Sequence, residues 1–374
     1  MPDYAQVPAS HHGSSGRGST PPDTAASTLM VVKDHPLNAE APLQALRELY
    51  TANQHFYVRS HLDEPDLVPQ DWLLHVEGAV THPFELSLDA LRVLPSRTIS
   101  ATLECAGNDR IGLAPLPKGE PWGSGAVSTG LWRGVSLSSV LQRTGLRPSV
   151  VEVRFDGADR GKPEGVDEEM AFARALPLAK ALDPDTLLAY ELNGAPLPPE
   201  HGGPVRLVVP DWYGMASVKW LQWIAALEQP FDGYFQTTSY VLERPGDASA
   251  LRPKEPLRTM RVKSLITSPA AGDAVPLGRQ QISGVAWSGA GGIVKVEISV
   301  EGEGEWQPAR LLGDAVPHAW RQWAWDWAPT RSGRYALRVR ATDAAGNTQP
   351  DVPEWNRLGY ANNAIQLVMV EARA

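Results

Sequence analysis

The sequence is short of cysteine: Cys105 is the only one among 374 residues. One cysteine cannot form a disulfide within the chain, so no oxidative framework holds the fold together, and reducing and oxidising compartments both stay open. No group of cysteines and histidines at close spacing accompanies it, which excludes a conventional zinc site. The thiol is therefore a small buried side chain, a nucleophile or the ligand of a softer metal centre.

Long apolar runs are also missing. No stretch of about 18 apolar residues occurs, so we expect no membrane span and no membrane partner. The first 27 residues are rich in Ser, Gly and Pro and lack the apolar core of a secretory signal peptide. We expect a disordered tail over residues 1–36 and a cytoplasmic location, although a removed leader would leave a periplasmic one open.

The sequence has fewer positively charged than negatively charged residues. The chain carries 34 Lys and Arg against 43 Asp and Glu, a formal net charge of −9. Such a chain has no basic field to attract a polyanionic backbone, so a nucleic acid is not an expected partner. No Gly-rich fingerprint follows a strand and opens a helix, and a nicotinamide or flavin site of Rossmann type therefore has no support.

Apolar periodicity in residues 37–255 predicts short helices mixed with strands. The helices are expected within 42–50, 86–96, 134–146 and 175–186, and the strands within 71–80, 150–157 and 187–194. They do not alternate regularly, which favours a mixed α+β domain over a doubly wound one. A Pro-rich, charged stretch over 243–260 is typical of a linker.

Residues 256–374 predict an all-β, immunoglobulin-like sandwich. Apolar positions alternate in runs of about 6 to 8 residues that are separated by Gly, Pro or Asp. The segment GAGGI, at 289–293, predicts a hairpin turn. Several tryptophans lie at strand positions, where packing in the core or at an interface is their expected role. They are Trp287, Trp306, Trp323, Trp325 and Trp327.

Cys105 itself follows a strand-like run, TISATLE at 98–104. Gly107 and Asn108 permit a sharp turn that would present the sulfur, and Arg110 brings a positive charge that favours the thiolate. This pattern fits a cysteine nucleophile, for which His201 would be the base. It equally fits a single soft-metal ligand whose remaining ligands come from a cofactor.

Five motifs, in order, resemble the sulfite oxidase family of molybdenum enzymes. They are FYVRSH at 56–61, TLECAGNDR at 102–110, PWGSGAVSTGLWRG at 121–134, LLAYELNGAPLPPEHGGPVRLVVP at 187–210 and SVKWL at 217–221. The resemblance runs from about Asn38 to the C-terminus and is to haem-free, bacterial or plant-like members. It implies a molybdopterin-binding domain over 37–255, a dimerisation sandwich over 256–374 and a homodimer.

The resemblance also implies the cofactor and the site. Molybdenum would be held by the dithiolene sulfurs of a pyranopterin, the molybdopterin, and by one protein thiolate, Cys105. The positions that match the family's cofactor-binding residues are Tyr57, Val58, Arg59, Ser60, His61, Cys105, Asp159, His201, Arg206, Ser217, Val218 and Lys219. Those that match its substrate and catalytic residues are Arg59, Arg110, Trp122, Tyr240 and Arg357. Paired guanidinium groups suit a dianion such as sulfite, because each donates two parallel hydrogen bonds.

The implied reaction is oxidation of sulfite to sulfate by oxygen-atom transfer. Three departures from the family pattern leave alternatives open. Ser60 replaces an asparagine, Met215 and Ala216 stand where an arginine is usual, and Arg357 comes one place early. A molybdoenzyme that acts on nitrate, another oxyanion or an S-oxide is one alternative. A non-catalytic pterin-binding or interaction protein is the other.

The electron acceptor has to be external. The sequence has no Cys-x-x-Cys-His haem attachment motif, since it has only one cysteine, and no segment resembles cytochrome b5. We expect oxygen or a separate carrier such as a cytochrome to take the electrons.

Overall fold

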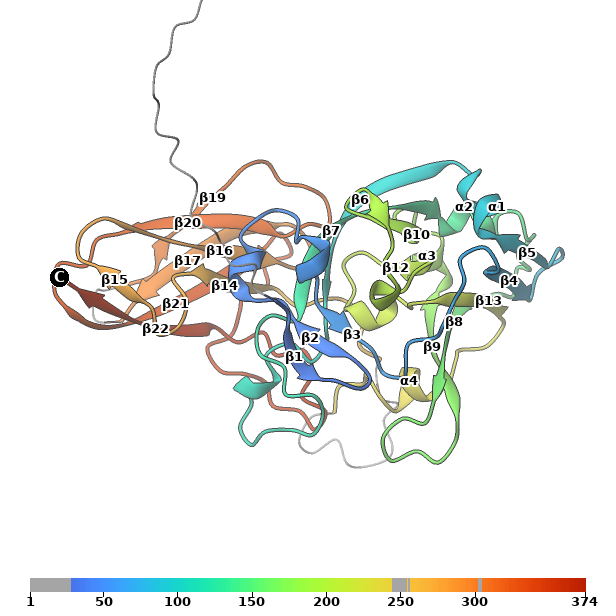
Figure 1. Ribbon diagram of the computed structural model, residues 1–374, viewed down its shortest axis with the longest axis horizontal. Coiled ribbons are helices and arrows are strands. Elements are labelled where there is room, and N and C mark those ends of the chain that lie inside the picture. The colour runs from blue at the N-terminus through green and yellow to red at the C-terminus, as the bar shows by residue number, and fades with distance from the viewer. Residues whose placement is uncertain (1–27, 244–253, 255, 302–304) are drawn as a thin grey trace, which may run out of the picture.

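The structure, a computed structural model, describes residues 28–243, 254, 256–301 and 305–374. Figure 1 shows two domains side by side, with the β-sandwich and the C-terminus at the left and the mixed first domain at the right. Within the described residues, no helix has the length and apolar character needed to cross a membrane. Most of the predicted linker lies outside the described residues, as does the predicted tail up to residue 27.

Three sheets build the first domain. The smallest has the order β1 (Met30–Lys33), β2 (Asn38–Glu40) and β3 (Val58–Arg59). The second runs β11 (Ala195–Pro196), β10 (Leu187–Leu192), β7 (Val127–Ser136) and β6 (Ser96–Glu104), with β12 (Arg206–Val208) paired to β10. The third runs β5 (Phe84–Ser87), β4 (Leu73–Gly78), β13 (Leu221–Leu227), β8 (Glu152–Gly161) and β9 (Met170–Pro177). Strand β1 lies inside the segment predicted as tail, where it pairs with β2.

Helices in the described part of the chain are short and sit at the ends of strands. The α-helices are α1 (Leu88–Arg92), α2 (Leu137–Leu141), α3 (Leu178–Ala181) and α4 (Tyr234–Thr237). The 3-10 turns are η1 (Leu43–Leu46), η2 (Asn53–His55), η3 (Arg110–Gly112), η4 (Pro199–His201) and η5 (Gly214–Ala216). Helix α1 begins where the sequence predicts, because the Ser87 side chain accepts a hydrogen bond from the Ala90 N–H.

The helix predicted over 42–50 is wrong beyond its first turn. Only η1 forms, and the residues that follow it contact the second domain. The Gln322 side chain donates to the Arg47 carbonyl at 2.5 Å, and the Trp320 indole donates to the Glu48 carbonyl at 3.2 Å. The segment after η1 is therefore a contact between the two domains.

The second domain is a two-sheet sandwich, which together with the mixed first domain confirms the predicted fold class. One sheet has the order β14 (Lys263–Ser268), β16 (Gln280–Trp287), β20 (Arg321–Trp327) and β19 (Arg310–Leu311). The other runs β15 (Ala274–Pro276), β22 (Gln366–Arg373), β21 (Gly333–Asp343), β17 (Ile293–Val300) and β18 (Gln307–Pro308). The segment 289–293 joins β16 to β17, but these strands lie in different sheets, so the predicted hairpin turn is wrong and the segment instead crosses from one sheet of the sandwich to the other.

The tryptophans pack as expected. Trp323 and Trp327 are buried in the core of the sandwich, while Trp287 belongs to a hydrophobic cluster that continues into the first domain. Trp325 packs against the sandwich core, and the Arg340 guanidinium lies 4.3 Å from the ring centroid of Trp306. Because one apolar cluster spans both domains, the sandwich is part of the scaffold of the first domain.

His318 forms an ionic bridge between the two domains. Its ring nitrogens lie 2.9 Å from Asp211 and 3.3 Å from Asp185, two carboxylates of the first domain. Its backbone carbonyl accepts a hydrogen bond from the Thr102 N–H at 2.8 Å. The hydrogen bond with Asp211 is the largest cause that raises the pKa of His318 above its ordinary value of 6.5, although partial burial opposes it.

This bridge predicts a pH-dependent stability. A histidine whose folded pKa is raised stabilises the folded protein most below its unfolded pKa, and that contribution is lost as the pH rises through the folded pKa. We expect His318→Gln to lower the Tm by about 2–4 °C at pH 5.5, and by much less at pH 9. The control is His82→Gln, on the surface of the first domain. An equal loss at both pH values would show that the charge of His318 contributes nothing.

Candidate active site

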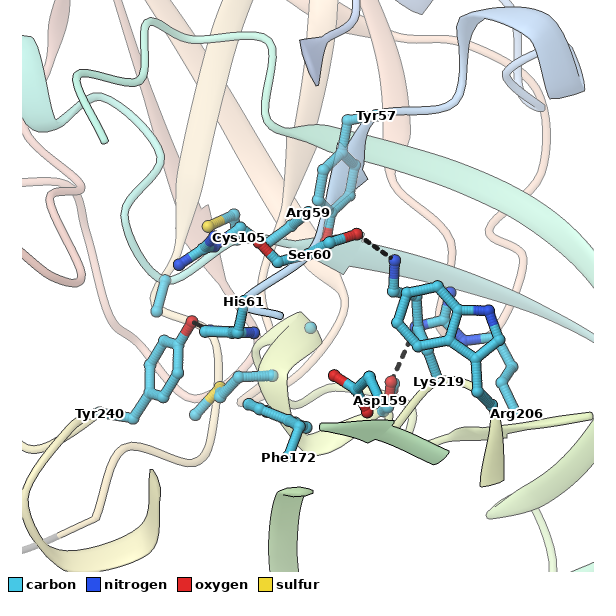
Figure 2. A pocket seen from close by; sticks show the side chains of 15 residues that line it. Tyr57, Arg59, Ser60, His61, Cys105, Asp159, Phe172, Arg206, Lys219 and Tyr240 are labelled. Atoms are coloured by element: carbon cyan, nitrogen blue, oxygen red, sulfur yellow. Dashed lines mark hydrogen bonds between the residues drawn. The ribbon is translucent and has the colours of Figure 1, made fainter. Parts of the chain in front are cut away.

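A cavity in the first domain gathers side chains from all three of its sheets. Figure 2 shows the sulfur of Cys105 and the guanidinium of Arg59 on one side and Lys219 and Arg206 on the other, with Tyr240, His61 and Phe172 below. The lining residues are Tyr57, Arg59, Ser60, His61, Cys105, Ala106, Asp159, Phe172, Arg206, Gly214, Met215, Ser217, Lys219, Trp220 and Tyr240.

Cys105 reaches this cavity because it directly follows β6. Strand β6 pairs with β7 in continuous register up to Glu104, opposite Val127, and the Cys105 N–H then donates to the Ala126 carbonyl at 2.9 Å. A tight turn follows, in which the Asn108 N–H donates to the Cys105 carbonyl at 2.9 Å. The turn predicted from Gly107 and Asn108 is therefore present, but it leaves the thiol only 5 % exposed.

The surroundings of this thiol suit a metal ligand. Burial raises the pKa of the Cys105 thiol, while Arg59, the Gly107 N–H and Arg110 act in the opposite direction. A buried thiolate needs a compensating positive charge, which a soft metal ion supplies on replacing the proton. Within the described residues, no group of three or more His, Cys, Asp and Glu side chains is placed to hold a metal. A metal on Cys105 would thus depend on ligands from a cofactor.

The opposite side of the cavity is cationic. Arg206 is buried and donates to the carbonyls of His201 and Ser217, both at 2.8 Å. Lys219 donates to the Ser60 hydroxyl at 2.7 Å and to the Glu200 carbonyl at 3.0 Å. Burial, followed by the repulsion of Arg206, lowers the pKa of Lys219 to about 7. An anion at this place would relieve that repulsion and restore the ammonium charge.

Two further features of the cavity fit an elongated, polar and anionic ligand. One carboxylate oxygen of Asp159, Oδ1, is buried without a hydrogen-bond partner in the protein, although buried polar atoms normally have one. Gly214 leaves space that a side chain would close, because a Cβ there would lie 2.5 Å from the Tyr57 hydroxyl. The cationic donors Arg206 and Lys219, the unpaired Asp159 Oδ1 and the Cys105 thiol together match the anionic group, the polar ring and the metal of a molybdenum-bound pyranopterin.

Tyr240 and His61 form a neutral pair at the cavity floor. The Tyr240 hydroxyl is hydrogen-bonded to Nε2 of His61, whose ring stacks on Phe172 with 4.4 Å between centroids. Burial raises the pKa of the Tyr240 phenol and lowers the pKa of His61, so both side chains are uncharged at neutral pH. Tyr240 has a left-handed φ of 37°, which a non-glycine residue adopts at a cost. The phenol is thereby held in place as a potential hydrogen-bond donor.

The structure brings ten of the predicted positions into the cavity lining. They are Tyr57, Arg59, Ser60, His61, Cys105, Asp159, Arg206, Ser217, Lys219 and Tyr240. Three other predicted cofactor positions lie behind this layer. Val58 is buried in β3, Val218 accepts the Leu207 N–H on its carbonyl at 2.8 Å, and Nε2 of His201 lies 3.2 Å from the Asn53 carbonyl. His201 is buried, and its carbonyl orients Arg206. It makes no contact with the Cys105 thiol, so the alternative in which His201 is the base of a cysteine nucleophile has no support.

Arg110 and Trp122 do not line the cavity. The Arg110 guanidinium is buried, donates to the Glu120 carbonyl at 2.6 Å and to the Leu358 carbonyl at 3.2 Å, and lies 5.2 Å from the ring centroid of Tyr360. Its charge is close enough to favour the Cys105 thiolate. Trp122 is buried in the hydrophobic cluster that also contains Cys105.

Arg357 is not brought to the cavity at all. Its side chain is 57 % exposed and forms an ion pair with Glu243, which also pairs with Lys254 at 2.5 Å. A substrate-binding role for Arg357 therefore has no support in this structure.

Sequence reasoning missed part of the lining. Met215 and Trp220 flank the Ser-Val-Lys triplet, and the Lys219 ammonium lies 3.9 Å from the ring centroid of Trp220. Because both residues lie close to a recognised motif, that motif could have identified them as part of the lining. Phe172 lies in β9, whose alternating pattern indicates an ordinary strand, and nothing in the sequence connects it with His61.

Comparison with known proteins agrees with this geometry. The family described as oxidoreductase molybdopterin binding domain matches residues 61–235, and the Mo-co oxidoreductase dimerisation domain matches residues 254–373. Sulfite oxidase of Gallus gallus is 37 % identical over 356 residues, which cover 90 % of this chain and 76 % of that protein. The chain belongs to the sulfite oxidase family of molybdopterin oxidoreductases.

Other members of this family extend the comparison. Mitochondrial sulfite oxidase of Homo sapiens is 38 % identical, and the match covers 91 % of this chain but only 65 % of that protein. A nitrate reductase of Brassica napus is 34 % identical over 90 % of this chain and 40 % of its own length. The crystal structure of the sulfane dehydrogenase SoxCD from Paracoccus pantotrophus superposes with a TM-score of 0.81 at 28 % identity, covering 95 % of this chain and 93 % of that one. The predicted molybdenum-molybdopterin cofactor is confirmed at the level of the family.

The cationic side of the cavity gives a first test of cofactor binding. We expect Lys219→Met to lower the pterin content per chain by about tenfold, because one hydrogen bond to a charged group is lost. The Tm of the cofactor-free variant should not fall, since a buried charge is removed. Pterin fluorescence after oxidation measures the content, and Lys295→Met, a change at an exposed lysine, is the control. Unchanged pterin content would remove Lys219 from the cofactor site.

Proposed function

We propose that the protein oxidises sulfite to sulfate. The observation that carries the proposal is a single buried thiol beside the Arg59 guanidinium, in a cavity that also holds the cations Arg206 and Lys219. When bound, the molybdenum cofactor supplies the transferable oxygen atom and takes up two electrons. Overall, sulfite gains an oxygen atom that derives from water, and two protons and two electrons are released.

The residues of the chain have distinct tasks in this scheme. Cys105 holds the metal and does not attack the substrate. Arg59 is fixed through a 2.9 Å hydrogen bond from Nη1 to the Asn38 side chain, so that its charge is oriented before an oxyanion arrives. The Tyr240 hydroxyl adds a neutral hydrogen-bond donor. Arg110 does not line the cavity, but its positive charge favours the Cys105 thiolate. Arg206, Lys219 and Ser60 face the other end of the cavity and would bind the cofactor's anionic group.

The sequence includes no haem attachment motif, which is in keeping with an external electron acceptor. We propose oxygen or a separate carrier such as a cytochrome as the acceptor. The match to a dimerisation domain supports a homodimer. The chain spans about 65 % of the length of the mammalian sulfite oxidases that it matches, so the activity of those longer proteins is extended to it here as a proposal.

A second candidate substrate is favoured by one observation. Arg357 faces Glu243 on the surface, and Met215 lines the cavity where the family pattern has an arginine. Fewer guanidinium groups near the thiol favour a substrate with less negative charge than sulfite, such as nitrate, an S-oxide or reduced sulfur in a sulfane. The similarity to nitrate reductases and to a sulfane dehydrogenase is in keeping with this alternative.

Metal content and turnover in the same preparation test the proposal. We expect one molybdenum per chain and sulfite-dependent reduction of ferricyanide. In Cys105→Ser the pterin should be retained, because its binding residues remain, while turnover should fall by at least about 100-fold. Full activity of Cys105→Ser would contradict the ligand assignment. Absence of molybdenum, under conditions in which a known molybdenum enzyme is loaded, would favour a non-catalytic protein.

A substrate panel separates the two enzymatic candidates. Sulfite, nitrate, dimethyl sulfoxide and a sulfane donor are compared by kcat/KM with the appropriate acceptor or donor. We expect sulfite to give the highest value, and Arg59→Met to lower it by about 100-fold through loss of a charged, bidentate contact. A higher kcat/KM for an uncharged or monoanionic substrate, with little effect of Arg59→Met, would replace sulfite by the second candidate.

A further inference from the structure

The second domain holds the loop that carries Cys105. The Ala361 N–H donates to the Ala106 carbonyl at 2.7 Å, one residue after the cysteine. The Asn362 side chain donates to the Asp109 carbonyl at 2.8 Å. Hydrogen bonds from another domain, one from its backbone and one from a side chain, thus fix Ala106 and Asp109 in a loop of five residues, Cys105 to Asp109.

A triplet of charges, formed by Lys263, Glu104 and Asp109, holds the same loop from both ends. Lys263, at the start of β14 in the second domain, is only 2 % exposed. Its ammonium lies 2.7 Å from Asp109 Oδ2 and 3.5 Å from Glu104 Oε1, and it donates to the Asn362 carbonyl at 2.9 Å. Glu104 immediately precedes the cysteine, and Asp109 is the last residue of the loop. One cation therefore links the two ends of the turn that presents the thiol.

The carboxylate of Glu104 is fully engaged. Its Oε2 accepts the indole N–H of Trp287, another residue of the second domain, at 2.9 Å. Its Oε1 accepts the Asn108 side chain at 3.1 Å, from within the loop. With both oxygens occupied, Glu104 has one well-defined rotamer, and the backbone of the next residue is fixed with it. Neither Glu104, Lys263 nor Trp287 lines the cavity, so they act on the site only through this loop.

We propose that Lys263 and Trp287 of the dimerisation domain are positioning residues for the Cys105 thiolate, acting through Glu104 and Asp109. The inference rests on the proposed function in that it takes Cys105 to be the metal ligand. An apolar group of similar volume would stabilise a buried position as well as an ion pair does, and often better. What the triplet adds is a fixed direction for the thiol, which sets how the sulfur meets a metal.

The lone cysteine provides a readout that is independent of turnover. In cofactor-free full-length chain, an aromatic disulfide reagent can label only Cys105, so its rate reports how firmly the loop is closed. We expect Lys263→Met to raise this rate by about tenfold or more, because buried Glu104 and partly exposed Asp109 lose their shared cation and the loop opens. Trp287→Phe keeps an aromatic ring but removes one donor, and should raise the rate by about threefold.

The matched control is Arg340→Met. Arg340 pairs with Glu297 at 2.9 Å within the second domain, across the β17–β21 strand pair. Its loss removes an ion pair of the same domain away from the Cys105 loop and should leave the labelling rate unchanged. In cofactor-loaded protein, Lys263→Met and Trp287→Phe should also shift the absorption band of the thiolate bound to molybdenum, whereas Arg340→Met should not.

The outcomes separate this inference from the proposed function. The inference would be overturned if both positioning variants are labelled within twofold of the wild-type rate and keep the same absorption band. This holds even if sulfite turnover is rapid. If Lys263→Met does not fold, Trp287→Phe alone decides. Faster labelling together with a shifted band supports the inference. Should the protein hold molybdenum but not turn over sulfite, the role of Lys263 and Trp287 stands and only the substrate assignment fails.

Discussion

The desolvation of charge around one cavity is the constraint on which the rest of this structure depends. A thiol and several cations are withdrawn from water together, and burial lowers the pKa of Arg206 to about 10 and that of Lys219 to about 7. Such groups stay inside only where fixed dipoles replace the lost water. Backbone carbonyls of His201, Ser217 and Glu200 provide those dipoles. The cavity is therefore a site prepared for an anion.

The fold meets this constraint with irregular segments at the ends of strands. Carbonyls that point into a cavity must come from turns, because those of a sheet are used in its ladder. The 3-10 turn η4 and Ser217, the residue after η5, supply them, and both turns adjoin strands of the two larger sheets. This is why helices are short in the described first domain: α1, α2 and α3 begin directly where strands end, and the cavity is built from strand ends and turns.

The second domain takes part in the same arrangement. Trp287, Trp320 and Leu265 belong to a hydrophobic cluster shared with the first domain, and His318 pairs with two of its carboxylates. The loop of Cys105 is in turn bonded to Ala361 and Asn362. A domain named for dimerisation in its family thus also completes the surroundings of the thiol. Loss of the packing of the second domain would first displace the loop that carries Cys105.

The sequence by itself determined the division into a mixed domain and a sandwich, the single thiol after a strand and most of the cavity lining. These follow from apolar periodicity and from short motifs, which act over a few neighbouring residues. The tertiary structure alone decided that the chain leaves its helix after Leu46, that Arg110 binds carbonyls, that Arg357 turns to Glu243 and that Phe172 meets His61. Each of these depends on a partner distant in sequence. A long side chain or a free carbonyl takes whichever partner the packed fold brings near, and no local pattern specifies that choice.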